Sequence, residues 1–169
     1  LDASIATWEA KRFYDYVRPV TAIRFLNTGK TIKGYGAGGV TAGITDIKGE
    51  AWRPYQPTTF PTPPFSEHTS GHSAFSAAGA EVLKQFTGSD AFGGSYTQAK
   101  ATLKVEPNAP AADVKLEWPT FSAAADEAGM SRLYGGIHFT NGDQAGRTLG
   151  RKVGAQVFMK AQAYWTGRA

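Results

Sequence analysis

Apolar side chains recur along three segments of the chain at the three- to four-residue spacing of an amphipathic helix. These segments are residues 3 to 17, 74 to 86 and 141 to 165. A further helix is predicted over residues 121 to 133. We expect the first helix to end or kink at Pro19, because proline donates no hydrogen bond inside a helix.

The last predicted helix carries two stripes at four-residue steps. The apolar stripe consists of Ala145, Leu149, Val153 and Val157, and the stripe beside it of Gly146, Gly150 and Gly154. Because glycine has no side chain, we expect a neighbouring helix to approach closely there.

The segments between the predicted helices are rich in turn-forming residues. Residues 28 to 52 are rich in Gly and Thr, which predicts a long surface loop or a short hairpin. Five prolines keep residues 53 to 69 stiff and extended. Residues 87 to 117 mix turns with short strands, such as residues 101 to 105. With no internal repeats, the pattern predicts an all-α (mainly α) helical bundle with long irregular loops, in one domain over residues 1 to 169.

Composition narrows the functional classes. The chain has 169 residues, of which 41% are hydrophobic and 19% charged, as expected for a globular protein. No apolar run approaches the ~20 residues that cross a bilayer, so we predict no membrane span. The net charge of +4 favours an anionic ligand but is too small and scattered to indicate nucleic acid. The absence of cysteine excludes disulfides, thiolate nucleophiles and cysteine-ligated metals.

The tripeptide Ser70-Gly71-His72 lies just before a predicted helix. The start of a helix presents unpaired N–H groups and a positive partial charge, which together favour anions. A hydroxyl and a glycine leave room for an oxyanion, and the imidazole can transfer a proton to it. The tripeptide therefore predicts an oxyanion site.

Two further pairs of residues could contribute to such a site. Lys11 and Arg18 are seven residues apart, so on one helix both would project from the same face and could grip one anion. Arg132 and His138 flank a pair of glycines that permits a tight reversal. The alternatives are solvent-facing charges for the first pair, and a surface arginine with a core histidine for the second.

Together these segments resemble a three-part signature. Lys11 with Arg18-Pro19, Ser70-Gly71-His72, and Ser131-Arg132 with His138 match in order and spacing the signature of vanadium-dependent haloperoxidases and type 2 phosphatidic acid phosphatases (PAP2). The sequences of residues 61 to 65, 71 to 78 and 131 to 139 are more similar to those of the soluble bacterial haloperoxidases than to those of the membrane phosphatases. The resemblance identifies the chain as the C-terminal part of a larger family member.

The resemblance implies a PAP2/vanadium haloperoxidase-like bundle that binds vanadate, with phosphate able to occupy the same site. The residues implied to hold the oxygens of vanadate are Lys11, Arg18, Ser70, Gly71 and Arg132. His138 is implied to bond the vanadium and His72 to act as acid and base, so that His72, His138 and Arg132 form the implied catalytic group.

The implied activity is oxidation of a halide by hydrogen peroxide to a hypohalous acid-type halogenating species, with a small organic substrate as a further partner. Three alternatives stay open: a phosphatase working through a phosphohistidine at His138, a non-catalytic oxyanion-binding domain, and a zinc site built on His68 and His72. The resemblance favours a secreted or periplasmic location. Halide preference and oligomeric state stay open, self-association being one alternative.

Three residues depart from the family pattern. Gly142 stands where the family usually has an aspartate that orients the second histidine, and the nearest acid is Asp143. Either Asp143 reaches back or His138 is less well oriented. Thr69 replaces a proline and could cap the helix, and His68 adds an imidazole that could tune His72.

Overall fold

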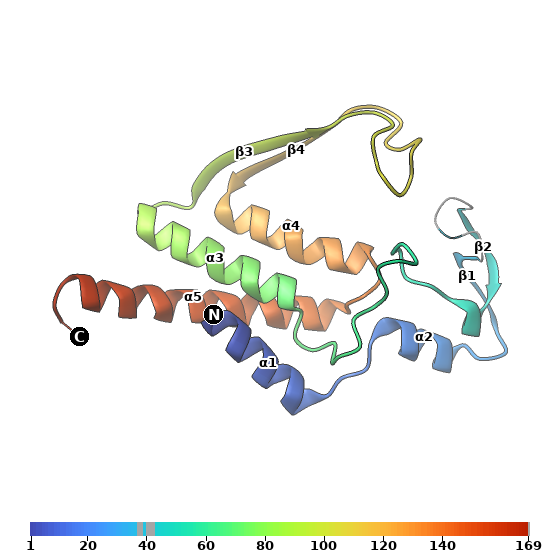
Figure 1. Ribbon diagram of the computed structural model, residues 1–169, viewed down its shortest axis with the longest axis horizontal. Coiled ribbons are helices and arrows are strands. Elements are labelled where there is room, and N and C mark those ends of the chain that lie inside the picture. The colour runs from blue at the N-terminus through green and yellow to red at the C-terminus, as the bar shows by residue number, and fades with distance from the viewer. Residues whose placement is uncertain (37–38, 40–42, 169) are drawn as a thin grey trace.

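The computed structural model describes residues 1–36, 39 and 43–168 (Figure 1). Its helices are α1 (Asp2–Tyr14), α2 (Pro19–Leu26), α3 (Gly71–Thr87), α4 (Phe121–Tyr134) and α5 (Thr140–Trp165), with a short 3-10 helix, η2 (Gly49–Ala51). Its strands are β1 (Thr31–Tyr35), β2 (Ile44–Lys48), β3 (Ala91–Gln98) and β4 (Val114–Thr120).

All four predicted helices are present, and α3 begins three residues earlier than predicted. Helix α3 begins at Gly71 because the Ser70 hydroxyl accepts the N–H of Ser73 and so caps the helix. Thr69, the predicted alternative cap, does not cap α3. Helix α4 begins in the same way, since the Thr120 hydroxyl accepts the N–H of Ala123 at 2.9 Å.

The prediction for Pro19 was wrong. Helix α1 ends at Tyr14, where Asp15 adopts a left-handed conformation with φ of 40°. Pro19 instead begins α2, a helix that we did not predict. Proline is favoured in the first turn of a helix, where its missing N–H would have no partner in any case.

Consequently Lys11 and Arg18 do not lie on one helix face. Lys11 belongs to α1, whereas Arg18 has the extended backbone expected of a residue before proline. The two cations approach each other because both donate to carbonyl oxygens of residues 65 to 67.

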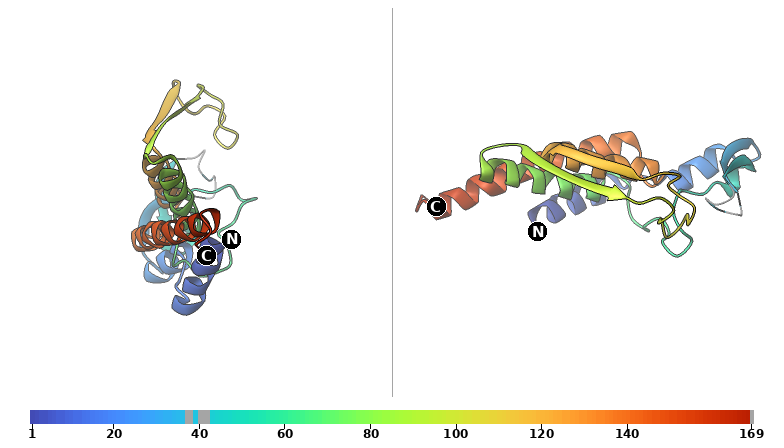
Figure 2. Two further views of the ribbon diagram at one scale, coloured as in Figure 1. Left: turned by 90° about the vertical axis from the view of Figure 1, so that its left-hand side faces the viewer. Right: turned by 90° about the horizontal axis from the view of Figure 1, so that it is seen from above.

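Two antiparallel hairpins make the fold a helical bundle with small strand pairs, rather than purely all-α. Strands β1 and β2 pair within the glycine-rich loop, as one of our two alternatives predicted. Residues 37–38 and 40–42 of that loop lie outside the described residues. Strands β3 and β4 form a long arm that projects beyond α4 (Figures 1 and 2). The strand predicted at residues 101 to 105 is wrong, since these residues belong to the loop between β3 and β4.

The core is built from small residues on α3, which packs between α4 and α5 (Figure 1). Ala74 and Ala77 are at most 1% exposed. A side-chain carbon built on Gly150 would lie 2.1 Å from the Ala74 carbonyl oxygen, and one on Gly154 would lie 2.6 Å from that of Ala78. The predicted close helix approach at the glycine stripe is therefore confirmed, and it fixes α3 firmly on α5.

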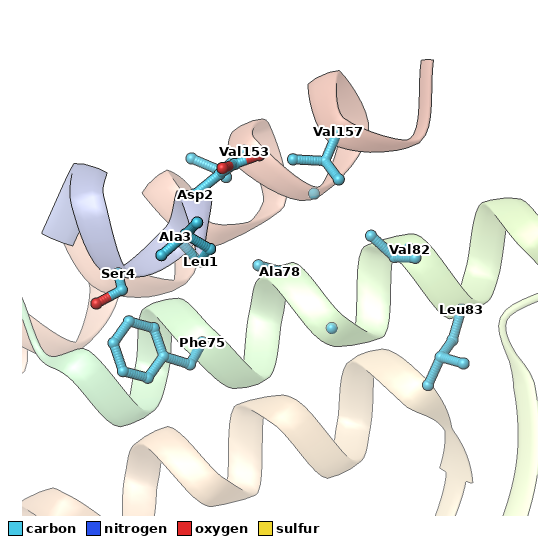
Figure 3. A pocket seen from close by; sticks show the side chains of 12 residues that line it. Leu1, Asp2, Ala3, Ser4, Phe75, Ala78, Val82, Leu83, Val153 and Val157 are labelled. Carbon is cyan, nitrogen blue, oxygen red and sulfur yellow. The ribbon is translucent and has the colours of Figure 1, made fainter. Parts of the chain in front are cut away.

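An apolar groove of about 680 Å³ runs between α3 and α5, with the first turn of α1 across it (Figure 3). Phe75 and Val82 of α3 and Val153 and Val157 of α5 line it. None of the helices within the described ranges combines the length and hydropathy of a membrane-crossing segment.

Candidate functional site

A cavity of about 290 Å³ lies at the start of α3. Six of the seven predicted site residues line it, although they come from three separate segments of the sequence. These six are Lys11, Arg18, Gly71, His72, Arg132 and His138. Its remaining lining is largely apolar and includes Trp8, Phe60, Phe65, Phe75 and Ile137.

The first two cations are held by carbonyl groups of the proline-rich segment. Lys11 Nζ donates to the carbonyl oxygens of Ser66 at 2.8 Å and Glu67 at 3.2 Å. Arg18 Nε donates to the Phe65 carbonyl at 2.8 Å. The predicted extended conformation is wrong, since the segment is irregular and bends at residues 64–65 and 68–69. Its carbonyls at residues 65 to 67 hold both cations at one wall of the cavity.

These cations are buried, with exposed fractions of 4% for Lys11 and 7% for Arg18. Burial lowers the pKa of Lys11 to about 8, helped by the charge of Arg18 and opposed by Glu67. Burial also lowers the pKa of both Arg18 and Arg132. Each shift means that the positive charges are poorly compensated, so an anion in the cavity would stabilise all three.

Arg132 reaches the cavity through a tight reversal at the end of α4. Gly136 has a φ of 67°, which a residue with a side chain rarely adopts, and the N–H of Ile137 donates to the Arg132 carbonyl at 3.2 Å. This turn brings Arg132 and His138 to the same cavity, as the glycine pair predicted. Arg132 Nε is buried and has no hydrogen-bond partner among the described residues.

The contacts of His138 define its tautomer. Arg18 Nη1 lies 3.1 Å from His138 Nε2, and a guanidinium can only donate. His138 Nε2 must therefore accept, which places the ring proton on Nδ1, 2.7 Å from Glu67 Oε1. Burial lowers the pKa of His138, together with the charges of Arg18 and Lys11, against the opposing effect of Glu67. The neutral ring thus directs a lone pair toward the basic side of the cavity.

Glu67 is the site residue that sequence reasoning missed as a partner of His138. It is 1% exposed, and its Oε1 also accepts the N–H of Phe139 at 3.0 Å. The sequence signal was the absence of an acid at Gly142, which requires that another acid fill the space. Sequence order could not reveal that this acid comes from the proline-rich segment.

Of the two alternatives for His138, the one in which Asp143 reaches back is wrong, and Glu67 holds the ring in its place. Asp143 Oδ1 accepts the Ser73 hydroxyl at 2.6 Å, and Arg147 Nη2 donates to Asp143 Oδ2 at 2.5 Å. Asp143 therefore forms an ion pair within α5 and a hydrogen bond that joins α5 to α3.

The residues around the start of α3 divide between cavity and core. His72 borders the cavity, and burial together with the Arg132 charge lowers its pKa. The Ser70 hydroxyl does not line the cavity; it lies in the core, 2.8 Å from the Ser73 hydroxyl. His68 also lies away from the cavity lining, with its ring packed edgewise on Tyr14 at 4.6 Å.

The zinc alternative receives no structural support. The part of the chain that the structure describes contains no group of three or more His, Asp or Glu side chains placed to hold a metal ion. Glu67, which could have completed such a site, is bonded to His138 instead.

Comparison with known proteins gives a consistent picture. The family model of the VCPO second helical-bundle domain matches residues 1–167. The chain is 28% identical to an apo-type bacterial vanadium-dependent chloroperoxidase, with a TM-score of 0.85 over 95% of this chain and 34% of that one. The holo-type structure gives 28% identity and a TM-score of 0.83 over 94% and 33%. A bacterial vanadium-dependent iodoperoxidase gives 31% identity and a TM-score of 0.62 over 94% and 30%.

The chain therefore spans about a third of the length of these solved structures. No curated protein matches the sequence significantly.

Proposed function

Because this chain belongs to the family of the VCPO second helical-bundle domain, we propose that it is the vanadate-binding part of a haloperoxidase. The single observation that carries the proposal is the convergence of Lys11, Arg18, Arg132 and His138 on one small cavity. Its fold is of the vanadium haloperoxidase type, and the solved relatives are described as a chloroperoxidase and an iodoperoxidase.

The residues of the cavity fit a tetrahedral oxyanion. Two buried cations and the partly buried Arg132 face it, and Arg132 Nε has a proton to donate with no partner in the described chain. Gly71 adds the first backbone N–H of α3, which the helix itself leaves unpaired. A side-chain carbon at Gly71 would meet only the Phe75 ring, at 3.8 Å, so packing within the protein does not explain a glycine there.

His138 supplies the nitrogen lone pair that would bond the vanadium. In the unliganded geometry this lone pair accepts from Arg18, so binding would replace that contact while Arg18 turns to an oxygen of the anion. The Glu67 carboxylate keeps the ring proton on Nδ1 throughout. Phosphate has the same shape and charge sign, and we expect it to compete for the same donors.

When bound, vanadate supplies the Lewis-acidic centre at which hydrogen peroxide is activated toward a halide. The net reaction consumes peroxide, halide and one proton, and yields hypohalous acid and water. Two electrons pass from the halide to the peroxide oxygens as the O–O bond breaks. His72 is the acid–base candidate for the proton, because its lowered pKa leaves the ring neutral and able to accept one.

The test is a halogenation assay of the purified chain with hydrogen peroxide and bromide, before and after addition of vanadate. We expect vanadate-dependent bromination, strongly reduced in His72→Ala and absent in His138→Ala. Vanadate affinity separates their roles, since His72→Ala should keep most of the binding and His138→Ala should lose it. Unchanged activity in both variants would contradict these roles.

A phosphatase is the second candidate, and one observation favours it. A neutral histidine whose Nδ1–H is held by a carboxylate is also a competent nucleophile toward phosphorus. Release of phosphate from p-nitrophenyl phosphate, lost in His138→Ala and without vanadate-dependent bromination in the native chain, would replace the haloperoxidase proposal.

A further inference from the structure

We propose that Glu67 is the positioning residue for His138, and that Gly142 is required to make room for it. The carboxylate that fixes the histidine ring thus comes from the proline-rich segment and not from helix α5. This inference rests on the proposed function in one respect, namely that His138 is the residue that binds the oxyanion.

The two positions exclude each other. A side-chain carbon built on Gly142 would lie 2.1 Å from Glu67 Oε1 and 2.6 Å from Glu67 Cδ. Both distances are far below van der Waals contact, so any side chain at Gly142 must displace the Glu67 carboxylate. The space beside His138 therefore holds one carboxylate, which comes either from position 67 or from position 142.

Glu67 cannot move aside easily. Its N–H donates to the Tyr16 carbonyl at 2.9 Å, and its carbonyl accepts from Lys11 Nζ. Its side chain is 1% exposed and bonded to both His138 Nδ1 and the Phe139 N–H. The segment that follows Glu67 is also anchored to α5, since the N–H of Ser70 donates to the Gly142 carbonyl at 2.9 Å.

The consequence concerns the geometry of the ring. With a carboxylate on Nδ1, the proton stays on that nitrogen and the Nε2 lone pair faces the cavity. Without an acceptor at Nδ1, the buried Nδ1–H would have lost its partner, and only the Arg18 contact at 3.1 Å would oppose a shift of the proton to Nε2. Such a shift removes the lone pair that an oxyanion site needs. Glu67 thus acts through His138 and makes no contact with a reacting atom.

The experiment measures the tautomer of His138 by 15N NMR on the unliganded protein at neutral pH, where three histidines give few signals. Assignment uses His138→Ala. The native chain should show the proton on Nδ1. Glu67→Ala should show a mixture of both tautomers. Glu67→Gln retains a carbonyl acceptor and should keep the native tautomer, which separates hydrogen bonding from charge.

The decisive variant is Glu67→Ala with Gly142→Asp, which returns the carboxylate to α5. We expect it to restore the Nδ1–H tautomer and to recover most of the vanadate affinity, which Glu67→Ala alone should weaken about 10–100-fold. The matched control is Glu67→Ala with Gly142→Ala, which fills the space without a carboxylate and should restore neither.

Two results would overturn the proposal. One is a native tautomer in Glu67→Ala. The other is a folded Glu67→Ala/Gly142→Asp protein that resembles the alanine control. If Glu67→Ala does not fold, Gly142→Ala alone replaces it in the test, because its methyl group must displace the Glu67 carboxylate. A native tautomer in Gly142→Ala would equally contradict the proposal.

The outcome is distinguishable from failure of the proposed function. The tautomer is read without vanadate, phosphate or peroxide. One possible result is that the His138 tautomer changes across these Glu67 and Gly142 variants as expected while the native chain shows no vanadate-dependent halogenation. That result would support Glu67 as the positioning residue and reject the haloperoxidase proposal.

Discussion

Single residues determine the charge of the cavity, and Lys11 is the one whose charge changes near neutral pH. Its Nζ is anchored by two carbonyls, so it stays in place whether or not it carries a proton. Its pKa of about 8 results chiefly from burial and from the neighbouring Arg18 charge. A change of pH above neutrality thus alters the charge of the site without altering its shape.

Anion affinity should therefore fall as the pH rises through about 8. Sulfate is the suitable probe, because its own charge is constant in this range. We expect a loss in affinity of at least about tenfold, since a cation ~4 Å from an anion contributes up to ~4 kcal/mol at an effective dielectric near 20, and each ~1.4 kcal/mol is a factor of ten. Titration calorimetry measures it. In Lys11→Met, the affinity for sulfate should be low at every pH. A native chain whose sulfate affinity does not fall above about pH 8 would refute the role of the Lys11 charge.

Stability should follow the opposite trend. The pKa of Lys11 is about 8 in the folded chain but 10.5 ordinarily, so between these values the unfolded chain binds more protons. The free energy of unfolding contributed by Lys11 therefore rises with pH across that window. Urea unfolding measures the free energy of unfolding of the native chain and of Lys11→Met. As the pH rises through this window, the native chain should gain stability relative to Lys11→Met. A difference that stays constant with pH would contradict the shifted pKa.

Much of the site could be predicted at this scale, and the failures have a common cause. The motifs identified Lys11, Arg18, Arg132 and His138 by residue type and spacing. The path that brings Arg18 to the cavity was wrong, because the left-handed Asp15 leaves no trace in a hydrophobic pattern. Glu67 was missed because its contact with His138 spans 71 positions.

At the scale of elements, the contact between α3 and α5 determines where the site lies. Glycines on α5 let its backbone meet carbonyls of α3, which sets the start of α3 beside the start of α5. Gly71 and His138 are thereby brought to the same cavity. The packing of these two helices is thus a condition for the geometry of the site.

Gly150→Ala should therefore destabilise the protein, because its new methyl group would lie 2.1 Å from the Ala74 carbonyl oxygen. Overpacking of this kind costs about 2–3 kcal/mol. Gly79→Ala is the matched control on α3, since no atom lies within 4 Å of its new methyl group. It should stabilise the protein by about 0.5–1 kcal/mol through helix propensity. Chemical unfolding measures both, and equal effects of the two substitutions would contradict the packing.

The helices that we predicted each carry a periodic pattern or a cap, as with Ser70 before α3 and Thr120 before α4, whereas the eight-residue α2 was missed. Strand β3 was not predictable, since its side chains are largely exposed and lack the alternation of a half-buried sheet, and the alternation of exposed and partly buried positions in β4 is short. Their pairing depends on each other across a loop of 15 residues, which local sequence does not encode.

Across the whole molecule, stability is unevenly distributed. The most deeply buried apolar residues cluster on α3, whereas the β3–β4 arm forms a two-stranded ribbon with mostly exposed side chains. A two-stranded ribbon is marginally stable on its own. The site lies against the stable part, at the start of α3.

Hydrogen exchange should reproduce this distribution. We expect the slowest amide exchange in the middle of α3 and in the facing turns of α5, and rapid exchange along β3 and β4. Mass spectrometry of peptic fragments measures it. Equal protection of the ribbon and of α3 would show that the ribbon is stabilised by contacts other than those described.

The central claim is that distant segments of the chain jointly bind one tetrahedral oxyanion. The most direct test is a crystal structure of the chain grown with vanadate. The account predicts vanadium bonded to His138 Nε2, with Lys11, Arg18 and Arg132 around its oxygens and Glu67 still on Nδ1. Vanadate bound elsewhere, or in the cavity with His138 turned away from it, would contradict the account.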